Sequence, residues 1–216
     1  MIDFFNNLII IIFDKITLKT MQISHVISDL ILAAIGLYVF FVYLSKLNLT
    51  STVLWESFVL SVTAAAIFGA ITFAGYPDSN PISLFFQKLA TITGGVGLVG
   101  ATFALVSGKD LSKTVCYSLL TLGFLLYLLS EAFGIVIIGK LTPIIAMSLV
   151  VVLALWGFIK GNSRVSIWLL LGVVFFALGT FRQQIFGKEE ITIDIFHYLT
   201  AAGILSLGMA NSKKTA

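Results

Sequence analysis

The chain has 216 residues, of which 59% are hydrophobic and only 11% are charged, and its mean hydropathy is +1.08. A soluble domain carries roughly 25% charged residues because its surface must stay hydrated, so the outer surface of this chain is expected to face lipid. The net charge of +3 does not indicate nucleic-acid binding, because the basic residues lie singly between apolar runs, as topology determinants do. The lone cysteine, Cys116, excludes an internal disulfide and is typical of a small apolar residue inside a helix.

Residues 1–20 contain a short apolar run, LIIIIF, with Asp3 before it and Asp14 after it. The segment lacks the basic start and the small-residue cleavage site of a signal peptide, and the run is too short to span a bilayer. We interpret it as a helix lying at the membrane interface, or as an extension ahead of an alternative start at Met21. The rest, residues 21–216, is predicted to be a single transmembrane domain.

Seven apolar segments follow, each about 18–25 residues long, which is enough to cross a hydrocarbon core of ~30 Å as a helix. Lipid cannot satisfy an open backbone, and the runs lack the alternation of a membrane β-barrel, so an all-α bundle is the predicted fold. The segments are Ser24–Leu47, Val53–Gly75, Ile82–Gly108, Leu111–Ser130, Leu141–Ile159, Val165–Gln183 and Ile193–Ala210.

Short polar links separate these segments, so sequential helices are predicted to be antiparallel neighbours. Tyr76–Pro81 has the prolines and Asn/Asp residues of a turn. The boundary between Glu131 and Pro143 is the least defined, because Gly134, Gly139, Lys140 and Pro143 interrupt an apolar run. It predicts either a loop dipping into the interface or a kinked start to the fifth helix.

The distribution of lysine and arginine predicts the amino terminus outside and the carboxyl terminus inside. The predicted outer side holds nearly all the acidic residues. The predicted inner side holds seven basic residues against six on the outer side: Lys46, Lys109, Lys113, Lys160, Arg164, Lys213 and Lys214.

Gly95–Gly100 matches G-x-G-x-x-G, the dinucleotide-binding fingerprint, but it lies within an apolar helix rather than after a strand. Gly97, Ala101, Ala104 and Gly108 instead fall on one helix face, which favours close packing against a neighbouring backbone.

Five ionisable residues near the predicted outer side are the main candidates for a site, because a charge at mid-bilayer costs roughly 2.5–3.5 kcal/mol on insertion scales. His25 and Asp29 lie one turn apart in the first segment, Asp194 and His197 share a face of the last, and Arg182 closes the sixth. In a structural interpretation Asp29 pairs with Arg182, and His197 hydrogen-bonds within the cluster. In a functional one, His25, Asp29, Asp194 and His197 are ligands of a divalent metal such as Zn²⁺. In a third, the residues stay at the interface and never meet.

Glu56 is a second candidate, about one turn into the second segment. One interpretation is structural: Trp55 anchors the helix at the membrane interface, and the Glu56 carboxylate lies near the positive end of the helix dipole. A proton or cation pathway through Glu56 is the alternative.

The layout of residues 24–210, with polar residues in the first, second and last helices, resembles the CREST group of membrane hydrolases, which includes the alkaline ceramidases and the progestin and adipoQ receptors. That resemblance implies a zinc-dependent lipid amide hydrolase with Ser-x-x-x-His in helix two and His-x-x-x-His in helix seven. His197 matches the first histidine of the helix-seven motif, whereas Ala201 takes the place of the second. Gly69 and Phe73 stand where the helix-two serine and histidine are needed, so two of the three zinc ligands are missing. The chain is also similar to uncharacterised bacterial seven-helix membrane proteins.

The sequence therefore leaves three functions open. The first is a non-enzymatic multi-pass protein of a bacterial inner membrane that acts as an accessory, sensor or assembly subunit, with the lipid bilayer and a membrane protein as its partners and no nucleic acid. The second is a CREST-like lipid amide hydrolase with a rearranged metal site. The third is a small proton-coupled transporter that uses Glu56 or Asp29. The last segment has no lysine for a retinal Schiff base, and no serine has a paired histidine and acid at a recognisable spacing.

Overall fold

A computed structural model describes residues 22–187 and 190–212 of the chain, so the predicted interfacial segment at residues 1–20 lies outside the described residues. These residues form helices and no strands, and seven of the helices are long and apolar enough to cross a membrane. The prediction of an all-helical fold with seven such helices is confirmed. The seven are Gln22–Leu44, α2 (Leu49–Phe73), Pro77–Ser107, α5 (Lys113–Glu131), α6 (Val136–Ile159), α7 (Ser163–Thr180) and α9 (Ile191–Asn211).

Two of these helices are composite. The first helix, Gln22–Leu44, ends in the π-helical turn η1 (Phe40–Leu44). The third consists of η2 (Pro77–Ser79), α3 (Asn80–Leu89), the π-helical turn η3 (Ala90–Gly94) and α4 (Gly95–Ser107). A short helix, α8 (Arg182–Phe186), precedes α9.

Local capping chemistry sets several helix ends. The Asn48 side chain accepts a hydrogen bond from the Ser51 amide at the start of α2, and the Ser112 hydroxyl accepts one from the Val115 amide at the start of α5. Both are residue types favoured at N-caps, where they satisfy an amide that has no partner in the helix. Gly108 ends α4 with φ of +68°, a left-handed conformation that glycine adopts without a steric penalty.

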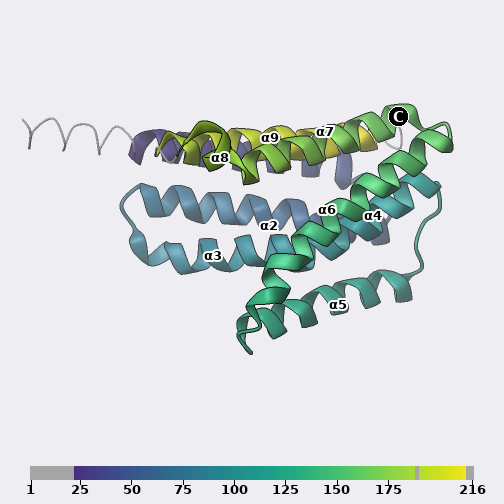
Figure 1. Ribbon diagram of the computed structural model, residues 1–216, viewed down its shortest axis with the longest axis horizontal. Coiled ribbons are helices and arrows are strands. Elements are labelled where there is room, and N and C mark those ends of the chain that lie inside the picture. Colours follow the sequence, from purple (N-terminus) through teal and green to yellow (C-terminus); the bar gives the residue numbers. More distant parts are fainter. Residues whose placement is uncertain (1–21, 188–189, 213–216) are drawn as a thin grey trace, which may run out of the picture.

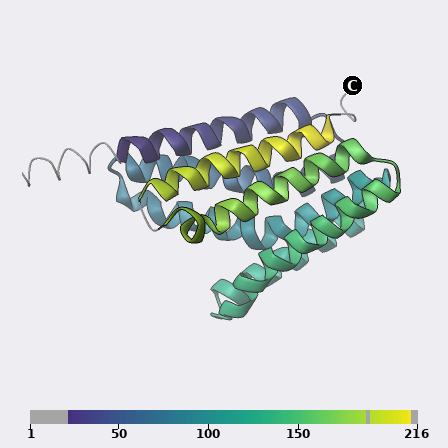
Figure 2. The same cartoon turned by 45° about the horizontal axis from the view of Figure 1, so that its top comes forward.

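The helices form two layers with a hairpin packed beside them (Figures 1 and 2). The first helix, α9 and α7 lie side by side in one layer, and α2 and the third helix lie beneath them. The α5–α6 hairpin packs on α4 and η3, with α6 crossing the bundle obliquely. The first helix and α9 are therefore direct neighbours although they are the first and last helices described.

The third helix packs closely against the backbone of α2 through its glycines, as predicted from the helix face that contains Gly97, Ala101 and Ala104. A Cβ atom at Gly97 would lie 2.9 Å from the Leu54 carbonyl oxygen, and Ala101 and Ala104 are buried. The inclusion of Gly108 in that face was wrong, because no atom lies within 4 Å of its Cβ position and it serves as the helix C-cap. The G-x-G-x-x-G stretch forms the first turns of α4, so its amides serve the helix.

Two helices, the third and α6, begin well before the residues that the sequence predicted, at Pro77 rather than Ile82 and at Val136 rather than Leu141. α6 begins at Val136 and includes Pro143, so the helical alternative at this boundary is correct and the loop is not. The predicted turn at Tyr76–Pro81 is largely helical, because η2 covers Pro77–Ser79 and Pro81 lies in the first turn of α3. A proline in a first turn costs no hydrogen bond, since the amide it lacks would have no partner there.

Candidate functional site: a buried hydrogen-bonded cluster

Polar side chains of the first helix and α9 meet where these two helices lie side by side. His25 and Asp29 are four residues apart on one helix, and Asp194 and His197 are three apart on the other. Residues with these spacings share a helix face, so each helix presents one imidazole and one carboxylate to the other. The structure thus brings together four of the five residues that the sequence placed near this end.

Asp194 is the centre of the cluster and is 5% exposed. Its Oδ1 lies 2.8 Å from Nδ1 of His25 and accepts a hydrogen bond of 2.7 Å from the Ser28 hydroxyl. Its Oδ2 accepts a hydrogen bond of 2.5 Å from the Ser24 hydroxyl. Three neighbours from one helix therefore converge on one carboxylate of another, an arrangement that stabilises a buried negative charge.

His197 links this centre to the second carboxylate. Its Nδ1 lies 2.9 Å from the Ser28 hydroxyl oxygen, and its Nε2 lies 3.3 Å from Oδ1 of Asp29. Ser28 is fully buried and also lies within hydrogen-bond distance of the His25 carbonyl oxygen. Asp194, Ser28, His197 and Asp29 thus form an unbroken row of polar contacts.

The backbone of α2 closes the cluster from the other layer. Gly69 packs against Asp29, because a Cβ atom there would lie 2.5 Å from Oδ2 of that carboxylate. This oxygen is buried and has no hydrogen-bond partner among the described residues. The Phe73 ring lies 4.8 Å from the His25 ring, measured between centroids. α2 therefore covers the cluster with a backbone surface and an aromatic ring rather than with a charge.

Arg182 does not pair with Asp29, so that part of the structural interpretation is wrong. Its Nη1 donates to the Gly179 carbonyl oxygen, and its guanidinium lies 4.5 Å from the centroid of the Phe196 ring. No ion pair of Arg182 occurs among the described residues. Partial burial lowers the pKa of its guanidinium from the ordinary value. A cation–π contact with the Phe196 ring, rather than an ion pair with a carboxylate, therefore stabilises the positive charge of Arg182.

A metal ion does not fit the cluster. Within residues 22–187 and 190–212, no three histidine, cysteine, aspartate or glutamate side chains are placed to hold one ion. The nitrogen atoms Nδ1 of His25 and Nδ1 and Nε2 of His197 already face an oxygen of the cluster. The predicted zinc site at His25, Asp29, Asp194 and His197 therefore gains no support from the geometry.

Glu56 lies apart from the cluster, in the opposite half of α2. It is half-buried, and it makes no hydrogen bond or ion pair with another described residue. The interpretation of Trp55 as an interfacial anchor is wrong, because Trp55 is only 1% exposed and belongs to the main hydrophobic core. The indole points inward since the neighbouring helices fill the space around this part of α2.

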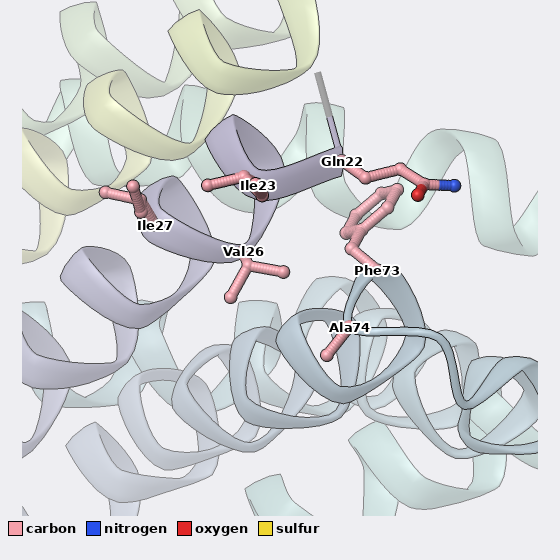
Figure 3. A pocket seen from close by; sticks show the side chains of 6 residues that line it. All are labelled: Gln22, Ile23, Val26, Ile27, Phe73 and Ala74. Atoms are coloured by element: carbon pink, nitrogen blue, oxygen red, sulfur yellow. The ribbon is translucent and has the colours of Figure 1, made fainter. Parts of the chain in front are cut away.

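A cavity of about 320 Å³ lies next to the cluster and is lined in part by Phe73, whose ring also contacts His25. Figure 3 shows that its lining comes from the first turns of the first helix and from the end of α2. None of the hydrogen-bonded side chains of the cluster lines it. The lining residues are Gln22, Ile23, Val26, Ile27, Phe73 and Ala74.

Sequence reasoning missed Ser24 and Ser28, which supply two of the three side-chain contacts to Asp194. The signal was their spacing, because they lie four residues apart and Ser28 follows His25 by three. Other serines follow the expected pattern of bonding to the preceding turn, as the Ser206 hydroxyl does to the Ala202 carbonyl.

We expect Gly69→Ala to destabilise the protein by about 1–3 kcal/mol, because the added methyl group overpacks the Asp29 carboxylate. The measurement is unfolding by SDS in mixed micelles. The same change in an Asp29→Ala background should cost much less, since the space beside Gly69 is then open. If Gly69→Ala lowered the free energy of unfolding equally in the two backgrounds, the close contact between Gly69 and Asp29 would not contribute to stability.

The family model that matches this chain covers nearly all of the helical domain. It is described as a family of unknown function, DUF6962, and it matches residues 24–213. The chain belongs to this family. The DUF6962 match begins at Ser24, so it includes every residue of the cluster. No curated protein and no solved structure matches the chain.

Proposed function

We propose that the chain is an integral protein of a bacterial inner membrane and acts there as a non-enzymatic accessory, sensor or assembly subunit. The observation that carries this proposal is the closure of the cluster. Its histidine, aspartate and serine side chains hydrogen-bond to one another across the first helix and α9, and Ser28 and Asp29 are almost fully buried. Such a cluster holds two helices together but gives a substrate no access to a nucleophile.

The hydrolase alternative has less support, because it needs an accessible nucleophile or a metal with three protein ligands and an open position. The transporter alternative has two protonatable groups, Glu56 and Asp29, but no hydrogen bond of the described residues leads from one to the other. The seven apolar helices and the coverage of all of them by DUF6962 favour a role within the membrane.

The test is purification of the tagged chain from its native membrane in a mild detergent. We expect a stable, stoichiometric membrane-protein partner and no release of fatty acid from lipid amides. Recovery as a monomer that hydrolyses a lipid would overturn the proposal, most clearly if Ser28→Ala abolished hydrolysis and left the thermal stability close to that of the wild type.

We also propose the amino terminus outside and the carboxyl terminus inside. Asp78 lies in the turn before α3, at the end of the bundle that holds the cluster, and Asp110 lies in the link after α4, at the opposite end. In a Cys116→Ala background, Asp78→Cys should react with a membrane-impermeant maleimide on intact spheroplasts, whereas Asp110→Cys should react only after lysis. The reverse pattern would invert the topology.

A further inference from the structure

We propose that the cluster is a proton-binding site in which one acid proton is shared between Asp29 and Asp194 through His197 and Ser28. The site consists of three contacts in a row, from Asp29 Oδ1 to His197 Nε2, from His197 Nδ1 to Ser28 Oγ, and from Ser28 Oγ to Asp194 Oδ1. His25 Nδ1 contacts the same oxygen of Asp194. This inference goes beyond the proposed function, and the cluster would hold its proton whether or not the chain has a partner.

The number of hydrogens available decides how these contacts are made. Each contact between two oxygen or nitrogen atoms needs one hydrogen between them. The Ser28 hydroxyl has a single hydrogen, but its oxygen lies 2.7 Å from Asp194, 2.9 Å from His197 and 3.0 Å from the His25 carbonyl oxygen. The carboxylate is the nearest and strongest acceptor of the three. If Ser28 donates to Asp194, then His197 must donate from Nδ1 to Ser28. Nε2 of a neutral His197 is then bare, and Asp29 must supply the hydrogen as a carboxylic acid.

Two ionised carboxylates leave one contact unfilled. With both Asp29 and Asp194 charged and His197 neutral, the imidazole has one hydrogen and Ser28 has one, and these two must serve three contacts. One of the three contacts then has no hydrogen, so that two lone pairs face each other there. This contact is either the 2.7 Å contact between Ser28 and Asp194 or one of the two contacts of His197. One additional proton fills every contact in the row.

The proton rests on Asp29 rather than on His197, because an ionised Asp29 would keep a buried oxygen without any donor. It rests on Asp29 rather than on Asp194, because Asp194 is the better place for the negative charge. Asp194 faces Ser24, Ser28 and His25, which stabilise its carboxylate. Asp29 faces only His197, and its Oδ2 is a buried oxygen with no partner among the described residues. A buried carboxylate with so little solvation is costly, whereas the same oxygen as the carbonyl of a neutral acid is tolerated.

A concerted shift moves the proton along the row without moving a heavy atom. Asp29 gives its proton to Nε2 of His197, Nδ1 gives its proton to Ser28, and Ser28 gives its own to Asp194. Three bonds to hydrogen break and three form, and the negative charge passes from α9 to the first helix. The titratable group in contact with the row is His25 from the first helix. Arg182 of α8 lies on the ring of Phe196, the residue before His197, and α2 faces the row with Gly69 and Phe73.

Histidine nitrogen spectroscopy tests this assignment. The chain has two histidines, both in the cluster, so ¹⁵N-histidine labelling reports on this site alone. In protein held in lipid nanodiscs at neutral pH, we expect His197 to show a protonated Nδ1 and a bare Nε2, with His25→Asn assigning the signals. A protonated Nε2 beside a bare Nδ1 on His197 would overturn the proposal, since Asp29 would then be ionised.

Infrared spectroscopy provides the independent measurement. We expect a protonated-carboxyl C=O band that disappears in Asp29→Asn and remains in Glu56→Gln, which removes a carboxyl of α2 outside the cluster. Asp29→Asn keeps the size of the side chain, and its fold is checked by its elution as a single species. A band that disappears in Glu56→Gln and remains in Asp29→Asn would place the proton elsewhere and refute the site.

Discussion

Replacing Asp194 with alanine is expected to destabilise the protein by about 3–5 kcal/mol, the range observed when one partner of a buried polar pair is removed. The change leaves His25, Ser24 and Ser28 without their shared acceptor, and two of these donors, His25 and Ser28, are buried. Thermal unfolding in detergent, followed by size-exclusion chromatography, measures the loss.

Asp78→Ala is the matched control, because it removes a carboxylate of the same kind from an exposed position in η2. We expect its stability to stay within about 0.5 kcal/mol of the wild type, as surface substitutions do. Equal stability of Asp194→Ala and Asp78→Ala would mean that the cluster does not hold the first helix to α9.

The second large effect is expected at Gly94, in the π-helical turn of the third helix. A Cβ atom there would lie 2.7 Å from the Ser57 carbonyl oxygen and 2.8 Å from the Phe58 Cα, and both atoms belong to the backbone of α2. Backbone cannot rotate away, so Gly94→Ala must push η3 and α2 apart at a cost of about 1–3 kcal/mol.

Gly95→Ala provides a control one residue away. Its nearest neighbour would be the Ala146 side chain at 3.3 Å, on α6, which is the least buried of the seven long helices described. Alanine also gains up to about 1 kcal/mol of helix propensity over glycine, which offsets that tight contact. SDS unfolding of the two variants should therefore separate them clearly, and indistinguishable curves would contradict the close approach of η3 to α2.

The sequence predicted the fold well because the bilayer imposes a simple length rule on apolar helices. All seven segments were found, and their largest errors were at the third helix, which begins at Pro77 rather than Ile82, and at α6, which begins at Val136 rather than Leu141. The error at α6 arose because Gly139, Lys140 and Pro143 resemble helix-breaking residues. In α6 the proline lies close enough to the amino terminus for the remaining turns to form around it.

The residues of the site were easier to predict than their pairing. Helical spacing placed His25 with Asp29 and Asp194 with His197, but the partners lie across helices, where no local pattern applies. Charge alone suggested that Asp29 would pair with Arg182, whereas the structure gives Asp29 the imidazole of His197 and places Arg182 on a ring. Ser24 and Ser28 were missed because a serine in a helix usually bonds to its own backbone.

The cluster also has a consequence for how the chain is made. It joins side chains 166 to 170 positions apart, from the first described helix to the last. During synthesis, His25 and Asp29 are therefore made long before Asp194 and His197 exist. The polar groups of the first helix stay without these partners until α9 has been made, and only a chain that has been synthesised past His197 can cover them. A chain that stalls earlier keeps this polar helix face uncovered.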